Sequence, residues 1–387
     1  MAFPLITILP PNWMGIILFF IICCYLVVFL LIGYGWQKIP EIDESDINKA
    51  VTVSVVIAAR NEDETLPRLL NDLYRQSYPV HLFEIIIIDD HSDKPVNDLK
   101  EVTGYPGHNL RVLDMPAGTY GKKQALLEGV KNSHSELLLF TDADCRTGPE
   151  WIQSFAEHYL QYSPDLIIGL IDYCHKPGIH QSFFRSDLLS LVITGAGTAS
   201  LGFATLCNGA NLAIKRNSYL RFAENIKSHI PTGDDMFMMH AIKKQNNAIS
   251  VLKNRNSIVR TEPPENGKEF LHQRIRWASK GTRYDDRETV WMAILVFISN
   301  LVIFISPFLC FVEIVSWRLF TGIFILKVLS DCQILSAAFG YFGRKHTIFL
   351  VPLFMPAYVI YAIATPFLGL LFQYSWKGRS YKGQILL

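Results

Sequence analysis

Apolar positions divide the chain into an apolar start, a mixed middle and an apolar end. Residues 1–37 contain no charged side chain, and Trp13 to Tyr34 form an unbroken apolar stretch. Because about 20 residues of helix cross a bilayer, this stretch predicts a transmembrane helix. A cleaved signal peptide is the alternative, but the basic n-region is absent, the apolar run is too long and no small-residue cleavage site follows it.

Three more apolar stretches lie near the end of the chain, at residues 289–317, 319–342 and 347–374. Each is long enough to span a bilayer and has Trp, Tyr, Arg or Lys at its edges, where interfacial anchors are expected. The middle stretch carries Lys327 and Asp331, which at i and i+4 can pair on one helix face. Alternatively, that stretch lies in the membrane interface, so we predict two or three spans.

Basic residues indicate the orientation of these helices. None precedes the first apolar stretch, whereas Lys38 and Lys49 follow it. The positive-inside rule therefore places the polar middle in the cytoplasm. Three spans after the middle would put the basic tail outside, against the same rule, so the sequence leaves the side of the C-terminus open.

Residues 50–287 alternate between strand-like runs and helical patterns. The strand-like runs are residues 52–59, 83–89, 110–115 and 136–141. Residues 84–89 are apolar on both faces, which is typical of a strand buried in a parallel sheet. Leucines at 66, 69, 70 and 73 have helical spacing. The alternation predicts an α/β fold with an open, mostly parallel sheet and right-handed crossovers.

Acidic residues follow three of the predicted strands, at residues 58–62, 89–93 and 141–145. In such sheets, ligands bind beyond the carboxyl ends of the strands. Like charges gathered there raise one another's pKa unless a cation lies among them, which argues for a divalent metal. Asp142 and Asp144 can face the same way, and paired carboxylates suit Mg²⁺ or Mn²⁺ on nucleotide phosphates.

Each of these motifs also has a simpler interpretation. Glu62 and Asp93 can be helix caps, and so can an acidic pair that precedes the helical pattern of residues 236–242. Lys122 and Lys123 open a helical pattern, where the helix dipole disfavours a cation. That position favours binding of an anion over an ordinary surface role.

Composition narrows the class of protein. The 387 residues are 50% hydrophobic, which is too apolar for disorder or for a purely soluble enzyme. The 36 Lys plus Arg and 35 Asp plus Glu leave a net charge of +1, so we predict no nucleic-acid partner. The seven cysteines form no CxxC pair and no cluster, which excludes a zinc ribbon and a disulfide framework and suits a reducing compartment.

Six segments, taken in order, resemble the family 2 glycosyltransferases. They are residues 53–62, 88–92, 121–126, 142–144, 232–235 and 273–277. The resemblance covers roughly residues 50–285 and is closest to the membrane-integrated branch that holds cellulose, chitin, hyaluronan and poly-N-acetylglucosamine synthases. It implies a GT-A-like fold, the fold of nucleotide-diphospho-sugar transferases, with transmembrane helices at both ends.

The resemblance also implies which residues bind the donor. Asp90 would contact uracil or another base, and the same nucleotide pocket would contain Ala58, Arg60 and Glu62. Lys122 would face the diphosphate or the donor sugar. Asp142 would lie beside the ribose and the metal, and Asp144 would hold Mg²⁺ or Mn²⁺.

The catalytic base and the acceptor segment are implied in the same way. Asp235 matches the acid of the family's proposed base, but Gly233-Asp234-Asp235 replaces the commoner Glu-Asp, so Asp234 is a second candidate. Asn208 and Gly209 match a segment near the acceptor. Leu127 departs from the family pattern, in which Asn is frequent.

The last segment contains Gln273, Arg276 and Trp277 on a helical pattern. In the relatives it lies at the membrane side of the site, which implies contacts with the acceptor sugar through Trp277 and with the donor diphosphate through the polar pair. An interfacial anchor is the alternative, since Trp and Arg favour the headgroup zone.

These observations predict a bacterial inner-membrane enzyme of polysaccharide or cell-envelope synthesis. Its parts are residues 1–37 (transmembrane), 50–262 (cytoplasmic glycosyltransferase), 263–287 (amphipathic), 288–375 (transmembrane) and 376–387 (basic tail). It would transfer a sugar from a nucleotide diphosphate sugar, preferably a UDP-sugar, to a glycan or lipid-linked acceptor, with inversion. The alternatives are transfer of one sugar to polyprenyl phosphate and an inactive nucleotide-binding membrane subunit.

Overall fold

The structure, a computed structural model, describes residues 13–41, 50–223, 233–371, 374–376 and 379–381. Thr232 of the segment 232–235 and most of the predicted basic tail lie outside the described residues. Two compact units divide the chain. The sheet unit comprises residues 35–264 and 375–381, and the helical unit comprises residues 1–34, 265–374 and 382–387. The domain boundaries predicted from the sequence stay a prediction.

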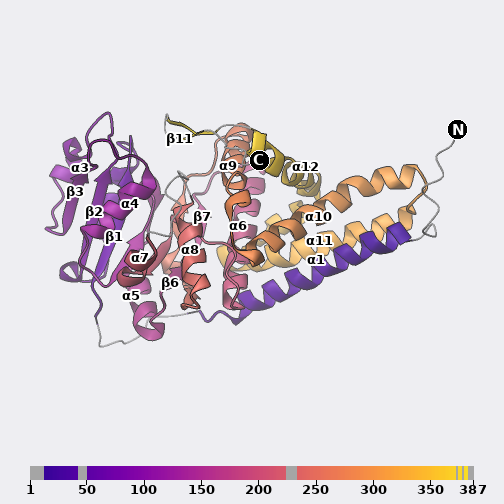
Figure 1. Cartoon of the computed structure of the whole chain (residues 1–387), viewed down its shortest axis with the longest axis horizontal. Coiled ribbons are helices and arrows are strands. Elements are labelled where there is room, and N and C mark those ends of the chain that lie inside the picture. The colour runs from indigo at the N-terminus through magenta and orange to yellow at the C-terminus, as the bar shows by residue number, and fades with distance from the viewer. Residues whose placement is uncertain (1–12, 42–49, 224–232, 372–373, 377–378, 382–387) are drawn as a thin grey trace. The chain divides into compact units, whose positions relative to one another are not determined.

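A seven-stranded sheet forms the centre of the sheet unit (Figure 1). Its strands are β1 (Val53–Ala59), β2 (Phe83–Asp89), β3 (Leu110–Asp114), β4 (Leu137–Phe140), β6 (Leu166–Ile168), β8 (Leu212–Lys215) and β9 (Ile249–Val251). They lie in the order β3-β2-β1-β4-β8-β6-β9, with β8 antiparallel to both of its neighbours. The other pairs are parallel, so the predicted mostly parallel α/β sheet is confirmed.

Helices connect the strands of the sheet unit. They are α2 (Leu66–Tyr74), α3 (Lys100–Thr103), α4 (Lys122–Lys131), α5 (Trp151–Tyr162), α6 (Ile179–Ser200), α7 (Arg216–Phe222) and α8 (Asp234–Lys244), with 3₁₀ turns η1 (Val80–Leu82), η2 (Val96–Asp98) and η4 (Arg255–Ser257). The four leucines of α2 are buried, as their spacing predicts. A Cβ at Gly129 of α4 would lie 2.5 Å from side-chain atoms of Ile88 and Val56, so this glycine lets α4 approach β1 and β2 closely.

A second, three-stranded sheet was not anticipated from the sequence. It contains β5 (Cys145–Arg146), β10 (Val259–Thr261) and β7 (Ile171–Tyr173) in that order. Arg185 of α6 donates to both carboxylate oxygens of Asp172 on β7, at 2.8 and 2.7 Å. This bidentate pair is almost fully buried, so it fixes α6 to the small sheet. Strands β11 (Tyr374–Trp376) and β12 (Arg379–Tyr381) form a two-stranded sheet.

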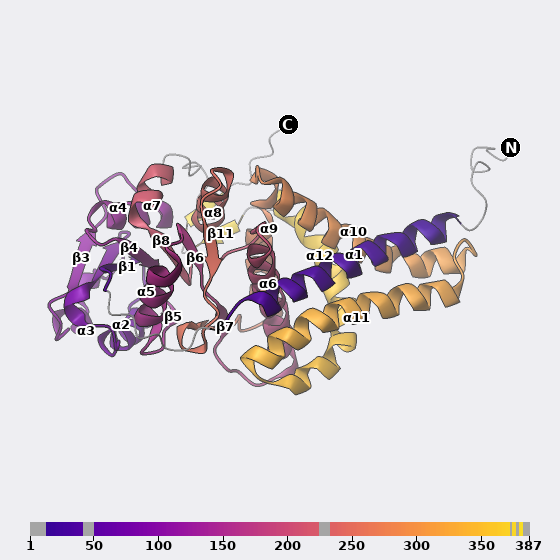
Figure 2. The ribbon, with the colours of Figure 1, turned by 90° about the horizontal axis from the view of Figure 1, so that it is seen from below.

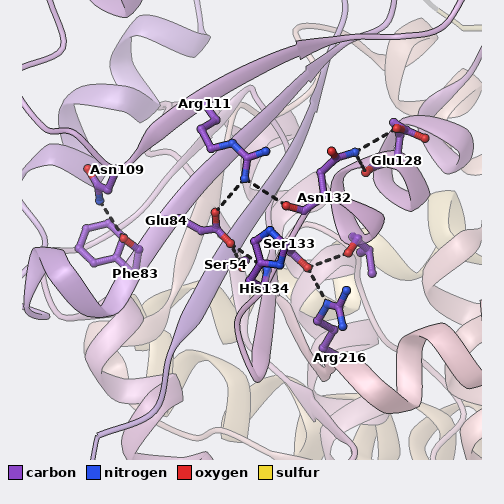
Figure 3. A network of polar contacts seen from close by, with 11 residues as sticks. Ser54, Phe83, Glu84, Asn109, Arg111, Glu128, Asn132, Ser133, His134 and Arg216 are labelled. Carbon is purple, nitrogen blue, oxygen red and sulfur yellow. Dashed lines mark hydrogen bonds and ion pairs between the residues drawn. The ribbon is translucent and has the colours of Figure 1, made fainter.

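Polar contacts connect residues at the amino edge of the large sheet, where β1, β2 and β3 begin (Figure 3). Glu84 accepts hydrogen bonds from Ser54 Oγ at 2.6 Å and from the backbone N–H of His134 at 3.2 Å. Arg111 lies 3.4 Å from the same carboxylate and donates to the carbonyl oxygen of Asn132 at 3.1 Å. The acid at this edge is therefore neutralised by contacts within the protein, which indicates a structural role.

The helical unit contains α9 (Gly267–Ala278), α10 (Arg287–Phe311), α11 (Trp317–Phe342), α12 (Val351–Leu371), the 3₁₀ turns η5 (Gly281–Arg283) and η6 (Lys345–Leu350), and most of α1 (Trp13–Lys38). Of the described helices, four are long and apolar enough to cross a membrane: α1, α10, α11, and η6 together with α12. In Figures 1 and 2, α1 and α11 lie side by side. Their lengths fit the predicted N-terminal span and three C-terminal apolar stretches.

An ion pair within α11 is hydrogen-bonded to a tyrosine of α1 inside this bundle. Lys327 is fully buried, and its Nζ lies 2.8 and 2.6 Å from the two carboxylate oxygens of Asp331. Tyr25 of α1 donates its hydroxyl to Asp331 at 2.8 Å, and its ring centroid lies 4.4 Å from Lys327 Nζ. The i, i+4 pairing expected from the sequence is thus confirmed. A neutral pair with a tyrosine partner lowers the cost of placing two charges in an apolar bundle.

We predict that the two charges stabilise the bundle only as a pair. Asp331→Leu leaves the buried Lys327 ammonium uncompensated, so it should destabilise the protein by about 3 kcal/mol more than the double variant Lys327→Met/Asp331→Leu. Tyr25→Phe removes the two hydrogen bonds of the Tyr25 hydroxyl, with Asp331 and with Lys327, and should cost about 1 kcal/mol. Thermal unfolding of the purified proteins in one detergent measures this order. Equal melting temperatures for the single and double variants would contradict it.

Candidate active site

Strands β1 and β2 end side by side, and hydrogen bonds connect the loops that follow them. Arg60 Nη1 donates to the carbonyl oxygens of Asp90 and His91, at 2.7 and 2.8 Å. Asn61 and His91 both have left-handed backbone conformations, with φ of 52° and 56°. Non-glycine residues in this region are uncommon and cluster at functional sites. The carboxyl edge of the sheet is therefore strained at the two loops where the sequence predicts the nucleotide pocket.

The residues predicted to bind the nucleotide lie on these loops. Asp90 is buried, and its Oδ2 accepts a hydrogen bond from the backbone N–H of Gly121 at 3.0 Å. Ala58 lies near the end of β1, paired with Ile88. Glu62 accepts from Thr65 Oγ1 at 2.6 Å, just before α2 begins. The structure thus brings Ala58, Arg60 and Asp90 to adjacent strand ends, with Glu62 in the following turn.

The interpretation of Asp93 as a helix cap is wrong. Its carboxylate accepts from Asn61 Nδ2 at 3.0 Å, and its backbone N–H donates to Asn61 Oδ1 at 2.8 Å. These two bonds join the loop after β2 to the loop after β1. The η2 turn that follows begins after Pro95 and has no side-chain cap. Asp93 therefore shapes the carboxyl edge of the sheet.

Lys122, at the start of α4, lies at the centre of an acidic cluster. Its ammonium forms an ion pair with Asp142, and the lysine side chain is 19% exposed. Burial lowers the pKa of Lys122, but the negative charges of Asp142 and Asp234 outweigh burial and raise that pKa above its usual value. Asp235 acts in the same direction. The structure therefore gathers the predicted phosphate lysine, Asp142 and both candidate bases within electrostatic range of one another.

Lys123, the next residue of α4, is buried and lies 5.3 Å from the ring centroid of Phe237 on α8. Burial lowers its pKa to about 8, although Asp234 and Asp235 act in the opposite direction. The paired lysines thus have different surroundings. Lys122 neutralises carboxylates, whereas Lys123 packs between α4 and α8.

Asp144 lies at the surface of the cluster. Desolvation by the surrounding protein and the negative charge of Asp142 raise the pKa of the Asp144 carboxyl, and Lys122 only partly offsets them. Among the described residues, no three His, Cys, Asp or Glu side chains are arranged to hold a metal ion. The two carboxylates of Asp142 and Asp144 fit a divalent cation that takes its other ligands from phosphate and water, because a cation would relieve their repulsion.

Asp235 is held in place at the start of α8. Its Oδ2 accepts from the backbone N–H of Gly209 at 2.9 Å, and its Oδ1 accepts from the N–H of Met236 at 2.8 Å. Asn208 precedes this contact and accepts from the N–H of Ala210 at 2.9 Å. The predicted base and the predicted acceptor segment are therefore in direct contact, although 26 residues separate Gly209 from Asp235 in the sequence.

Asn211, which ends the same segment, was missed as a structural residue. It is fully buried, and its Oδ1 accepts from the indole N–H of Trp151 at 2.9 Å. Its amide group donates to the carbonyl oxygens of Leu170 and Ser257, at 2.7 and 2.9 Å. Asn211 thereby joins three separate segments beneath the site. The sequence predicted no strand at β8, which begins directly after Asn211, and so gave no signal for this role.

The segment with Gln273, Arg276 and Trp277 lies on α9 of the helical unit. Arg274 is the buried basic residue of this helix: its guanidinium lies 4.2 Å from the ring of Trp277 and 4.5 Å from that of Phe270. Arg274 Nη1 also donates to Gln273 Oε1 at 2.6 Å. Sequence reasoning selected Arg276 and missed Arg274, which orients Gln273 and Trp277.

Comparisons with known proteins relate part of the chain to one family of enzymes. Residues 54–222 match the model of Glycosyl transferase family 2. The chain is 26% identical over 128 residues to the glycosyltransferase AglE of Haloferax volcanii, covering 33% of this chain and 41% of the relative. It is 30% identical over 196 residues to a 4,4'-diaponeurosporenoate glycosyltransferase of Staphylococcus haemolyticus, covering 47% and 49%. The chain spans less than half the length of these two relatives.

A solved structure has the same fold. The mannosyltransferase PcManGT of Pyrobaculum calidifontis, in complex with GDP-Man and Mn²⁺, matches 92% of this chain and 99% of its own, with a TM-score of 0.58 and 15% identity. The likeness confirms the predicted GT-A-like fold. Residues 54–222 thus carry the likeness to Glycosyl transferase family 2, and the described residues also include four helices long and apolar enough to cross a membrane.

Proposed function

We propose that the protein is a membrane-integrated glycosyltransferase that uses a nucleotide diphosphate sugar, preferably a UDP-sugar, and inverts the anomeric centre. The observation that carries the proposal is the cluster around Lys122 at the carboxyl edge of the sheet. A lysine and paired carboxylates there suit a donor diphosphate and a cation, and a second carboxylate pair suits an acceptor hydroxyl.

Asp235 is the general base in this proposal. Its carboxylate takes the proton of the acceptor hydroxyl while the oxygen attacks the anomeric carbon and the nucleotide diphosphate leaves. The hydrogen bond from Gly209 holds the carboxylate beside the Asn208–Gly209 segment, where we place the acceptor. A single displacement by an external nucleophile inverts the anomeric centre, so an α-linked donor gives a β-linked product.

Lys122 binds the donor diphosphate, and Asp90, with Ala58, Arg60 and Glu62, binds the base end of the nucleotide. Asp142 and Asp144 would hold Mg²⁺ or Mn²⁺, as the Mn²⁺ in the mannosyltransferase complex suggests. Such a cation, when bound, neutralises charge that develops on the leaving diphosphate. When a cation and a diphosphate bind, the ion pair of Lys122 with Asp142 can be exchanged for contacts with them.

Trp277 is proposed to stack on the acceptor sugar, with Gln273 and Arg276 on the donor diphosphate. A flat indole suits a sugar face, and a guanidinium suits phosphate through its forked donors. Arg274 acts as a positioning residue for Gln273 and Trp277, because it contacts both. The acceptor is proposed to be a glycan or lipid-linked molecule, since the chain has apolar helices that can lie in lipid.

The domain is proposed to face the cytoplasm of a bacterial cell, where nucleotide sugars are made, with the helices in the inner membrane. Two other functions are open to test. One is transfer of a single sugar to polyprenyl phosphate, against which the Gln273–Trp277 segment argues. The other is an inactive nucleotide-binding subunit, against which the acidic cluster argues. Release of diphosphate nucleotide from a panel of nucleotide sugars, with and without metal, identifies the donor and excludes the inactive subunit.

Asp235→Asn is expected to lower transfer by at least a hundredfold and to leave nucleotide binding nearly unchanged. The amide keeps the shape of the side chain but cannot accept the proton. Product formation and equilibrium binding of the nucleotide, measured on the same preparation, separate the two effects. Asp234→Asn is the matched control on the neighbouring residue. If Asp234→Asn is the inactive variant and Asp235→Asn is active, the base is Asp234.

Removal of the metal is expected to abolish turnover, as is Asp144→Ala. Without a cation the acidic pair repels the donor diphosphate, so excess chelator should reduce transfer at least a hundredfold, and Mg²⁺ or Mn²⁺ should restore it. Glu101→Ala is a control, because Glu101 is an exposed acid on α3. Full activity of the Asp144→Ala protein, or of wild-type protein in chelator, would overturn the metal assignment.

A further inference from the structure

The loop before α4 is tied to the end of β2 at two points. His91 Nε2 donates to the carbonyl oxygen of Thr119 at 3.0 Å, and the backbone N–H of Gly121 donates to Asp90 Oδ2 at 3.0 Å. Thr119 also bonds through its N–H and its hydroxyl to the carbonyl oxygen of Pro116, at 3.1 and 2.6 Å. Tyr120 lies between the two tied residues, so its backbone is held on both sides.

The ring of Tyr120 is exposed at this position. Its residue is 56% exposed, and its ring centroid lies 4.8 Å from that of His91 at an interplanar angle of 47°. His91 in turn follows Asp90, the residue proposed to bind the base of the nucleotide. An aromatic ring with a restrained backbone therefore stands beside the base pocket and still presents much of its surface to solvent.

We propose that Tyr120 is a stacking residue for the nucleobase of the donor, supported by His91. This inference rests on the proposed function, because it takes the base to lie beside Asp90. Hydrogen bonds from Asp90 can orient the edge of a base but cannot cover its face. None of the other residues proposed for the pocket, Ala58, Arg60 and Glu62, is aromatic. The Tyr120 ring supplies that missing apolar surface, since every base has a π-face that can stack on an aromatic ring.

The sheet unit contains a second tyrosine with similar surroundings, which provides a matched control. Tyr162 is 47% exposed, and its ring centroid lies 4.9 Å from that of His158 at 50°. It ends α5 and precedes β6, so it lies where β6 starts, at the opposite edge of the sheet from Asp90. If loss of any exposed tyrosine that contacts a histidine lowered nucleotide affinity, Tyr162→Ala would lower it as much as Tyr120→Ala.

The test uses the full-length protein in lipid nanodiscs, titrated with UDP, GDP and inorganic pyrophosphate. Tyr120→Ala should weaken binding of the preferred nucleotide about tenfold, the loss expected from one base stacked on an aromatic ring. Tyr120→Phe should stay within about twofold of wild type, and so should Tyr162→Ala. Pyrophosphate has no base, so its inhibition of nucleotide binding should be the same for wild type and Tyr120→Ala.

Two results would overturn the proposal. One is nucleotide affinity of Tyr120→Ala equal to wild type. The other is an equal loss of pyrophosphate and nucleotide affinity, which would mean that Tyr120 shapes the loop around Lys122 and does not stack on the base. Failure of the proposed function is distinguishable, because wild-type protein would then bind neither UDP nor GDP, or would bind a nucleotide without transferring sugar from any nucleotide sugar of the panel. His91→Asn, which tolerates the left-handed backbone but removes the supporting ring, should give a smaller loss than Tyr120→Ala.

Discussion

Repulsion among carboxylates at one edge of the sheet is the constraint on which the site depends. Parallel strands bring their carboxyl ends to the same edge, and in this chain those ends are followed by acids. Lys122 neutralises part of this charge through Asp142, while the pKa of Asp144 remains raised by desolvation from the surrounding protein and by the charge of Asp142. The excess negative charge that is left over suits a cation and, through it, a diphosphate. The fold thus brings carboxylates close enough to repel one another, and binding of a cation would reduce that repulsion.

At the amino edge of the same sheet, the acidic side chain of Glu84 has its charge balanced by partners within the protein. Glu84 is compensated by Arg111 and by hydrogen bonds from Ser54 and His134, so its charge is used within the protein (Figure 3). The difference between the two edges lies in how the charge is compensated rather than in the presence of acids. A carboxylate whose charge is balanced by neighbouring groups stabilises the fold, whereas a carboxylate whose charge is only partly balanced can still bind a charged ligand.

In the helical unit, two side chains of opposite charge form an ion pair. Lys327 and Asp331 neutralise each other one turn apart, and Tyr25 adds a hydrogen bond from α1. An apolar bundle cannot offer water to either charge, so the pair has to be complete within the protein. The same contacts link the first apolar helix to the third, which gives α1 a defined partner in the bundle. The N-terminal helix is therefore packed as part of the unit and is more than an anchor.

Periodicity and strand-end composition were enough to predict much of the protein, since they depend on neighbours in sequence. Alternating runs determined the mostly parallel sheet, and apolar lengths determined the long helices. The sequence could not show that β8 runs antiparallel, that Asp235 bonds to Gly209, or that Arg274 lies against Trp277. It also gave no sign that Asn211 joins three segments or that the ring of Tyr120 contacts the ring of His91. Most of these contacts join side chains and backbone groups from separate segments, and the Arg274 contact depends on how one helix is buried. Only tertiary folding decides such partners, because local pattern records which residues are polar but not which group each will meet.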